Sequence, residues 1–257
     1  MNYITSSDNN KIKSLIRLKT AHGFKKSDCF IAEGFTMLDE AIKSDADVME
    51  VFLLEKYKDD FFNRYDLLEK SKINFLTEDL MKKVSNTVSS REVVFTVKKN
   101  LVKTALDEFY SYPDRLLFVE DISDPGNLGT IMRTAEAFGF NDIIITNNSA
   151  SFFNDKVVRA SMGAIFRLNL YNMSVEDIIE LAKDYKLIAT CPRGESEFNV
   201  DERFILALGN EARGLSESLL DNADYRLTIP MRGKIESLNL SVAAGISMYI
   251  LNGGKFC

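Results

Sequence analysis

Short apolar runs alternate with amphipathic stretches through the first hundred residues of the chain. Apolar runs of this length, rich in valine, isoleucine and phenylalanine, are typical of buried strands. They predict strands at 48–54, 73–76 and 93–97. Apolar residues at helical spacing predict helices at 10–21, 35–44 and 77–85. The alternation predicts a small α/β domain over residues 1–98, followed by a polar linker at 99–103.

The same pattern restarts in the remainder of the chain, which we treat as a second domain at 104–257. The predicted strands are 116–120, 142–146, 187–190, 204–208 and 225–229, alternating with helices, and the last helix is predicted at 238–251. Such alternation indicates a mainly parallel sheet that helices cover on both faces. Because ligands of these sheets bind at the carboxyl ends of the strands, the loops that follow the strands are the candidate functional segments.

The first predicted helix is basic on one side. Its apolar face holds Ile12, Leu15, Ile16 and Leu18, and the basic residues opposite are Lys11, Lys13, Arg17 and Lys19. Residues 1–28 carry a formal charge of +4, whereas the rest of the chain carries −10. Charge alone leaves two interpretations open, a solvated helix face and a surface that binds RNA phosphates.

Composition excludes several classes of protein. Hydrophobic residues make up 46% and charged residues 27% of the chain, and neither a membrane-spanning segment nor a signal peptide is recognisable, which favours a soluble, cytoplasmic protein without a membrane partner. The three cysteines form no CxxC pair, so neither a zinc site nor a disulfide framework is expected. Because His22 is the single histidine, one chain cannot build a Ser-His-Asp or Cys-His site.

The first candidate loop follows the strand at 116–120. A turn containing Asp124, Pro125, Gly126 and Asn127 leads into a helix, so that Asn127 is expected near its N-cap. Arg133 falls on a helix face away from the apolar residues. A well-capped βα turn explains the turn residues but provides no reason for this arginine.

The second candidate loop follows the strand at 204–208. It places Gly209, Asn210, Glu211, Arg213 and Gly214 ahead of a short helix that starts near Ser216. Its two glycines allow the backbone to approach a ligand closely. Leu215 stands where a phosphate loop requires lysine, and GxGxxG is absent, so nucleotide hydrolysis and dinucleotide binding are both disfavoured.

The third candidate segment joins the strand at 225–229 to the last helix through Pro230 and Gly233. Ser237, Asn239 and Ser241 gather small polar side chains at the start of that helix. Capping by Ser237 is an alternative interpretation that needs no function.

Taken together and in this order, NLGTIMRTAEAFGF, LALGNEARGLS and IPMRGKIESLNLSVAAGIS closely resemble the three motifs of the SpoU (TrmH-type) RNA ribose methyltransferases of the SPOUT superfamily. The segment DKVVRASMGAIFRL, residues 155–168, is similar to the family's connecting segment, and the resemblance covers about 115–252. Upstream, FIAEGFTMLDEAI at 30–42 resembles the small, L30e-like substrate-binding domain that often precedes this catalytic domain.

The resemblance implies a SPOUT-type sheet tied into a trefoil knot, S-adenosylmethionine as the cofactor, and a homodimer. The positions that match the family's polar active-site set are Asn127, Arg133, Glu211, Ser237 and Asn239. The positions that match cofactor-lining residues are Leu208, Gly209, Gly214, Ile229, Met231 and Leu238. Methyl transfer from a sulfonium needs no metal, which is consistent with the missing metal motif.

The resemblance assigns Arg133 as the base that activates the ribose hydroxyl. An arginine normally stays protonated, so the alternative is that cationic Arg133 stabilises the developing alkoxide or holds the adjacent phosphate. The basic helix with Lys11, Lys13, Arg17 and Lys19 is then expected to bind the backbone of a structured RNA. Ribosomal RNA is favoured over transfer RNA. The other hypotheses are a catalytically silent RNA-binding assembly factor, a base methyltransferase with the same knot, and, more remotely, an oxidoreductase.

Overall fold

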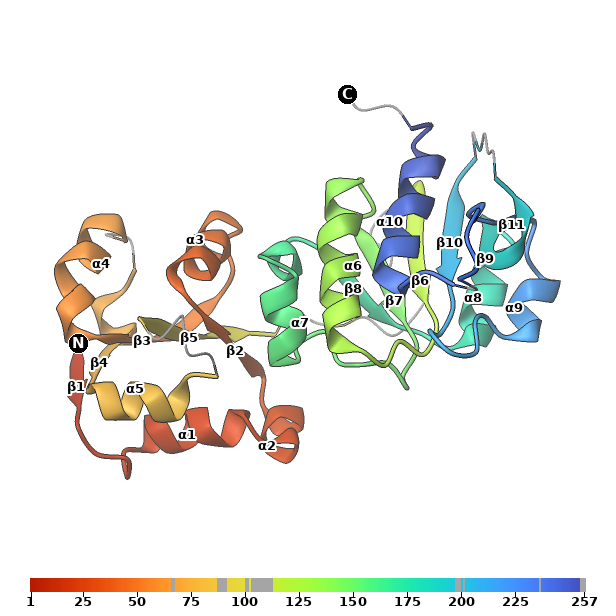
Figure 1. Cartoon of the computed structure of the whole chain (residues 1–257). Coiled ribbons are helices and arrows are strands. Elements are labelled where there is room, and N and C mark those ends of the chain that lie inside the picture. The colour runs from red at the N-terminus through yellow and green to blue at the C-terminus, as the bar shows by residue number, and fades with distance from the viewer. Residues whose placement is uncertain are drawn as a thin grey trace. The chain divides into compact units, whose positions relative to one another are not determined.

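The computed structural model describes residues 1–65, 68–86, 92–99, 102, 113–196, 200, 202–235 and 237–254. The chain forms two compact units, Met1–Asn100 and Leu101–Cys257. Each unit is built around its own sheet, and each is considered by itself (Figure 1).

The first unit is a five-stranded mixed sheet with helices on both faces. Its strands are β1 (Asn2–Ile4), β2 (Cys29–Glu33), β3 (Val48–Leu54), β4 (Ile73–Leu76) and β5 (Val93–Lys98), in the order β1-β4-β3-β5-β2. Strands β1, β4 and β3 are parallel, and β5 is antiparallel to both β3 and β2. One face carries α1 (Asn10–Leu18), α2 (Ala21–Lys26) and α5 (Glu78–Val84), and the other carries α3 (Phe35–Lys43) and α4 (Lys58–Arg64) (Figure 1). Short 3-10 turns lie at Glu55–Tyr57 and Lys70–Lys72.

The three predicted strands of this unit are confirmed as β3, β4 and β5, whereas the prediction of one helix at 10–21 is wrong at its end. The chain turns after Leu18, and Thr20 caps a new helix by accepting a hydrogen bond from the Gly23 N–H. A Cβ at Gly23 would lie 2.1 Å from the Arg17 carbonyl oxygen, so the turn is too tight for a side chain there. Ile16, predicted in the apolar face, is 39% exposed.

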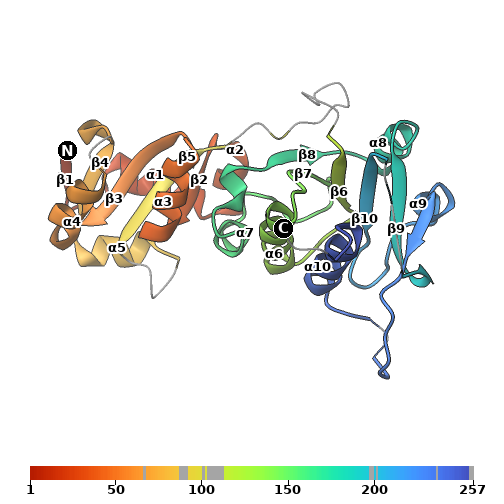
Figure 2. The same ribbon diagram turned by 90° about the horizontal axis from the view of Figure 1, so that it is seen from above.

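The second unit is a six-stranded, fully parallel sheet in the order β11-β9-β10-β6-β7-β8. Its strands are β6 (Arg115–Val119), β7 (Asp142–Ile145), β8 (Asn169–Asn172), β9 (Lys186–Glu195), β10 (Phe204–Leu208) and β11 (Tyr225–Leu227). Helices α8 (Val175–Leu181) and α9 (Glu217–Asp221) share a core with one face of the sheet. On the opposite face, α6 (Pro125–Ala137) packs against α7 (Asp155–Ala160) and α10 (Leu240–Leu251) (Figures 1 and 2). A 3-10 turn lies at Ala164–Phe166.

The predicted parallel α/β sheet is confirmed, and the corrections concern β8 and helix starts. Strand β8 was not predicted. Asp124, rather than Asn127, caps α6, and Asn127 is the third residue inside that helix. Asn239, rather than Ser237, caps α10, which therefore starts two residues later than predicted. Ser216 precedes α9 as predicted.

The trefoil knot stays a prediction.

Among the described residues, no helix combines the length and the apolar character that a membrane crossing requires.

A candidate active site at the carboxyl ends of the parallel strands

The three candidate loops meet because the strands before them end at the same edge of the sheet. Leu208, the last residue of β10, pairs with Val119, the last residue of β6, and the Glu120 N–H donates to the Leu208 carbonyl at 2.9 Å. Strand β9 lies between β10 and β11, so the segment that follows β11 starts from this edge as well. The register therefore places segments far apart in the sequence side by side.

A chain of side-chain hydrogen bonds connects these segments. Asn127 Nδ2 donates to Glu211 Oε1 at 3.2 Å, and Asn239 Nδ2 donates to Asn127 Oδ1 at 3.0 Å. Ser123 Oγ donates to the other Glu211 oxygen at 3.4 Å. Because Asn239 Oδ1 accepts from the first N–H groups of α10, the starts of α6 and α10 and the loop after β10 are joined. The structure thus brings together Asn127, Glu211 and Asn239, and it adds Ser123.

The loop after β10 is closed on itself. Asn210 and Gly214 exchange two backbone hydrogen bonds, of 3.0 and 2.9 Å, and Gly214 has a φ of +70°, which favours glycine. A Cβ on Gly209 would lie 2.1 Å from the Gly214 carbonyl carbon and 2.2 Å from the Leu215 nitrogen. Both predicted glycines are therefore needed for the shape of this loop, one for its backbone conformation and one for a close approach of backbone to backbone.

Asp121, which no sequence motif indicated as a site residue, connects the loop after β10 to its neighbours. Its φ of +49° is uncommon for a residue other than glycine. Its carboxylate accepts from the Thr146 hydroxyl at 2.7 Å and from the Arg213 guanidinium at 3.0 Å, and its carbonyl accepts from Asn210 at 2.8 Å. The buried Glu120 beside it accepts from the Ser216 N–H at 2.8 Å. The tolerance of aspartate for this backbone region is the one signal in the sequence that could have indicated this position.

Asp124 keeps a negative charge at the start of α6. The pKa of its carboxyl lies below the ordinary value because it accepts a hydrogen bond from the Asn127 backbone N–H at 2.8 Å and, in addition, from Lys156 at 3.1 Å. This carboxylate fixes the first turn of α6, and with it the backbone from which the Asn127 side chain projects.

Arg133 and Ser237 do not join this hydrogen-bonded chain. Arg133 follows Asn127 by six helical residues, which is about 9 Å along the axis and about 120° around it. Its side chain is exposed and has no hydrogen-bond or ion-pair partner among the described residues, and neither has Ser237. The two residues therefore stay predicted members of the site.

The predicted cofactor residues belong to the end of β10, the loop after it, and the segment between β11 and α10. Leu208 and Gly209 are buried at the end of β10, and Ile229 is half-buried after β11. Met231 and Leu238 are 42% and 37% exposed. Exposed apolar side chains beside a glycine-containing backbone loop, at the carboxyl end of a parallel sheet, fit a flat apolar ring such as adenine with a short polar chain attached.

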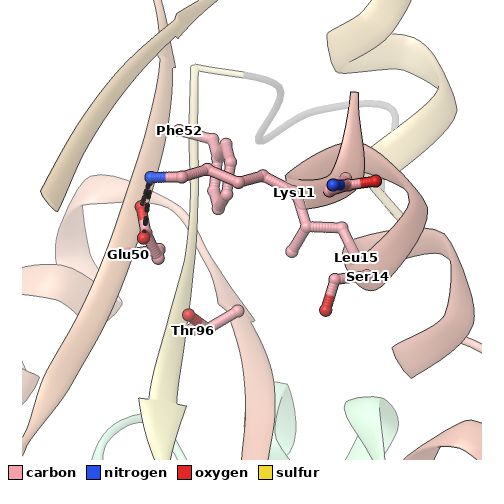
Figure 3. Close-up of a pocket in the computed structure, with 7 residues that line it drawn as sticks. Lys11, Ser14, Leu15, Glu50, Phe52 and Thr96 are labelled. Atoms are coloured by element: carbon pink, nitrogen blue, oxygen red, sulfur yellow. Dashed lines mark hydrogen bonds and ion pairs between the residues drawn. The ribbon is translucent and has the colours of Figure 1, made fainter. Parts of the chain in front are cut away.

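The four residues predicted to bind RNA differ in their surroundings. Lys11 points at Glu50 and binds both carboxylate oxygens at 2.7 Å, beside a pocket that Phe52 and Thr96 also line (Figure 3). Lys19 donates to the carbonyls of Lys83 and Ser85 at the end of α5. Lys13 is exposed and paired with Asp8 at 3.1 Å, and Arg17 is exposed without a side-chain partner among the described residues. The RNA contacts remain a prediction for all four.

Residues 114–249, more than half of the chain, match the SpoU rRNA methylase family, and residues 9–94 match the MRM3-like substrate-binding domain. The chain belongs to the SpoU rRNA methylase family. This SpoU methylase is 30% identical over 258 residues to the 23S rRNA (guanosine(2553)-2'-O)-methyltransferase RlmP of Bacillus subtilis, an alignment that covers 98% of this chain and 100% of that protein.

Two solved structures resemble this SpoU methylase over almost its whole length. An rRNA methyltransferase from Sinorhizobium meliloti with S-adenosylmethionine bound has a TM-score of 0.85 at 23% identity and covers 99% of this chain and 98% of its own. An RNA 2'-O ribose methyltransferase has a TM-score of 0.79 at 26% identity and covers 96% of each chain. The predicted family, α/β fold class, RNA methyltransferase activity and S-adenosylmethionine cofactor are confirmed.

Proposed function

We propose that the protein transfers the methyl group of S-adenosylmethionine to the 2'-hydroxyl of a ribose in ribosomal RNA. The observation that carries the proposal is the hydrogen-bonded chain from Glu211 through Asn127 to Asn239, which lies beside the closed loop 209–215. Polar groups from three segments converge there on one edge of the sheet, next to exposed apolar side chains. This arrangement suits a polar acceptor held against an apolar cofactor.

The residues that hold the cofactor are the backbone of 208–214 together with Ile229, Met231 and Leu238. The sulfonium of bound S-adenosylmethionine supplies an activated methyl group that an oxygen nucleophile can displace in line. The tight closure of loop 209–215 fixes the backbone N–H and carbonyl groups that would bind the cofactor, so little conformational entropy would be lost on binding.

The polar residues position the ribose and handle its charge. The Asn127 side-chain amide is hydrogen-bonded by Glu211 and by Asn239, so its orientation toward the acceptor is fixed. Arg133, which has no partner among the described residues, offers its positive charge to the hydroxyl oxygen as negative charge develops there, or to the adjacent phosphate. Glu211 orients the ribose, and the Ser237 hydroxyl forms a further hydrogen bond to the ribose.

Ribosomal RNA is the proposed substrate for two reasons. The relative RlmP is named as a 23S rRNA enzyme, and residues 9–94 match a substrate-binding domain. In that domain Arg17 is an exposed cation on α1 without a side-chain partner among the described residues, whereas Lys13 pairs with Asp8, and Lys11 and Lys19 stabilise the unit itself. Because ribosomal RNA is available in the cytoplasm, we expect the protein to act there. Transfer RNA is the alternative substrate.

The test is methyl transfer from labelled S-adenosylmethionine to unmodified 23S rRNA, followed by alkaline hydrolysis. A 2'-O-methyl group removes the hydroxyl on which alkaline cleavage depends, so the label is expected in alkali-resistant dinucleotides. Label in mononucleotides would mean base methylation. Label on transfer RNA alone would mean that transfer RNA is the substrate. No label on any RNA would favour a protein that binds RNA without methylating it.

We propose further that the protein is a homodimer that pairs through α10. Val242 and Tyr249 are 49% and 38% exposed, and Ile246 lies between them at helical spacing. The opposite side of the helix, with Ala244, Ser247 and Met248, is buried. A helix that is apolar on both sides needs a second surface to cover it.

Replacing Val242 by arginine is expected to weaken the dimer about thirtyfold or more, because each subunit then places an unpaired charge in the interface. Light scattering after size exclusion should find twice 29.1 kDa for the unaltered protein and 29.1 kDa for the variant at micromolar concentration. The matched control is Ile16→Arg, since Ile16 is a comparably exposed apolar residue on α1. A monomeric unaltered protein, or a dimeric Val242→Arg, contradicts the proposal.

A further inference from the structure

The second unit has an excess of negative charge, although its proposed substrate is a polyanion. Residues 101–257 contain 22 acidic and 15 basic side chains. Protein affinity for RNA depends on cations that neutralise phosphates and release counterions. A cation already paired with a carboxylate contributes little of this, and a cation whose N–H groups bind a neutral protein oxygen has fewer donors left for a phosphate. The best placed cations of the unit are therefore those without an intramolecular partner.

Most basic side chains in the described part of this unit have a partner. The paired ones are Arg115 with Asn252, Lys156 with Asp124, Arg159 with Asp155, Arg167 with Glu136, Lys183 with Glu180, Lys186 with Asp224, Arg203 with Asp114, Arg213 with Asp121, and Arg226 with the Leu220 carbonyl. The four that remain within the described residues are Arg133, Arg193, Arg232 and Lys234, and all four are exposed.

Three of these four lie on two adjoining segments. The end of β9, where Arg193 lies, runs against the start of the segment after β11: the Thr228 N–H donates to the Glu195 carbonyl at 2.8 Å, and the Thr228 hydroxyl to the Pro192 carbonyl at 3.2 Å. Arg232 and Lys234 follow Thr228 by four and six residues. Figure 2 shows the segment between β11 and α10 projecting past the sheet on the side where β9 ends. We call Arg193, Arg232 and Lys234 the cationic rim.

The described part of these two segments contains more basic than acidic side chains. The described residues 191–196 and 228–235 contain the three cations and one acidic side chain, Glu195. Gly194 allows the end of β9 to lie close to β11, from which the second segment starts, since a Cβ there would lie 2.1 Å from the Arg226 carbonyl oxygen. The segment after β11 also carries Met231 and Leu238, so the cations border the proposed cofactor surface.

We propose that the cationic rim binds the phosphates of the RNA strand next to the methylated ribose, in addition to any RNA contact made by the first unit. The inference rests on the proposed function, which makes RNA the substrate. Unpaired guanidinium and ammonium groups on an exposed surface match phosphate oxygens in charge and hydrogen bonding. The acidic remainder of the unit repels RNA elsewhere, which confines binding to this side.

The experiment compares two triple variants of the full chain for binding to unmodified 23S rRNA transcribed in vitro, between 50 and 200 mM salt. The test variant is Arg193→Gln with Arg232→Gln and Lys234→Gln. The control is Arg159→Gln with Lys183→Gln and Arg203→Gln, which removes the same charge from cations that are ion-paired. The slope of log affinity against log salt is expected to become shallower by about two to three in the test variant and by less than about one in the control.

Methylation and S-adenosylmethionine affinity are measured in parallel on the same proteins. The affinity of the test variant for S-adenosylmethionine should stay within about threefold of the unaltered protein, since phosphates rather than the cofactor are bound. Equal slopes for the two triple variants, or a rim variant that loses cofactor rather than RNA, overturn the inference. If the unaltered protein itself places no label in alkali-resistant dinucleotides, the proposed function fails, and that result is read separately from the slopes.

Discussion

Replacing Arg133 by alanine is expected to lower the rate of methyl transfer by about a hundredfold to a thousandfold, with little change in protein stability. The loss corresponds to removing one group that stabilises charge in a transition state. Stability should hold because the Arg133 side chain is exposed and has no partner among the described residues. The measurement is a single-turnover rate with labelled S-adenosylmethionine and saturating RNA, together with the unfolding temperature.

A lysine at position 133 separates the two roles that are open to this residue. Substantial retained turnover indicates that positive charge is what matters, whereas a loss as large as that of alanine indicates that guanidinium geometry or proton removal is required. Arg159→Ala is the matched control, because Arg159 is a partly exposed arginine of the same unit that pairs with Asp155. Turnover of Arg133→Ala within threefold of the unaltered protein would exclude Arg133 from the reaction.

The sequence predicted best those strands whose apolar pattern follows from burial in the sheet. Strands β3, β4 and β10 were predicted at their observed bounds because mostly apolar runs follow from burial in a covered sheet; Glu50 and Asn74 are the polar residues within β3 and β4. Strand β8, with the sequence NLYN, was missed because half of its residues are polar. Its Asn169 side chain pairs with Asp142 on β7, a tertiary contact that no local pattern reports.

The candidate site could be predicted in part for a similar reason. A parallel sheet brings all the loops at its carboxyl edge together, so locating the loops in the sequence was enough to place Asn127, Glu211 and Asn239 near one another. Which of several polar residues caps a helix depends on a shift of only one or two positions along the chain. The observed caps are Asp124 and Asn239, whereas the sequence suggested Asn127 and Ser237.

Pairing of charges could not be predicted from the sequence. Lys11 and Arg17 lie on the same helix and carry the same charge, yet Lys11 binds Glu50 on β3 whereas Arg17 has no partner in the described part of the chain. The partner of Lys11 is 39 residues away and becomes a neighbour through the sheet alone. Selecting RNA-binding cations therefore requires the structure, which shows which charges are already neutralised.

Replacing Gly209 by alanine is expected to weaken S-adenosylmethionine binding by about tenfold to a hundredfold and to lower the stability of the free protein by about 1–3 kcal/mol. The added Cβ would lie 2.1 and 2.2 Å from backbone atoms of Gly214 and Leu215, so no side-chain rotation can relieve the contact. The loop must open instead, and the paired hydrogen bonds between Asn210 and Gly214 are strained or lost. Binding is measured by calorimetry, and stability by unfolding without the cofactor.

The control for this glycine is Gly245→Ala, in the middle of α10. A Cβ there meets the Thr134 methyl carbon at 3.5 Å, an ordinary contact, and alanine favours the helix. Its stability should equal or exceed that of the unaltered protein, with unchanged cofactor affinity. If Gly209→Ala binds S-adenosylmethionine within threefold of the unaltered protein, the closed form of loop 209–215 is not what holds the cofactor. A loss of stability without a loss of affinity would lead to the same conclusion, because the loop would then serve the fold alone.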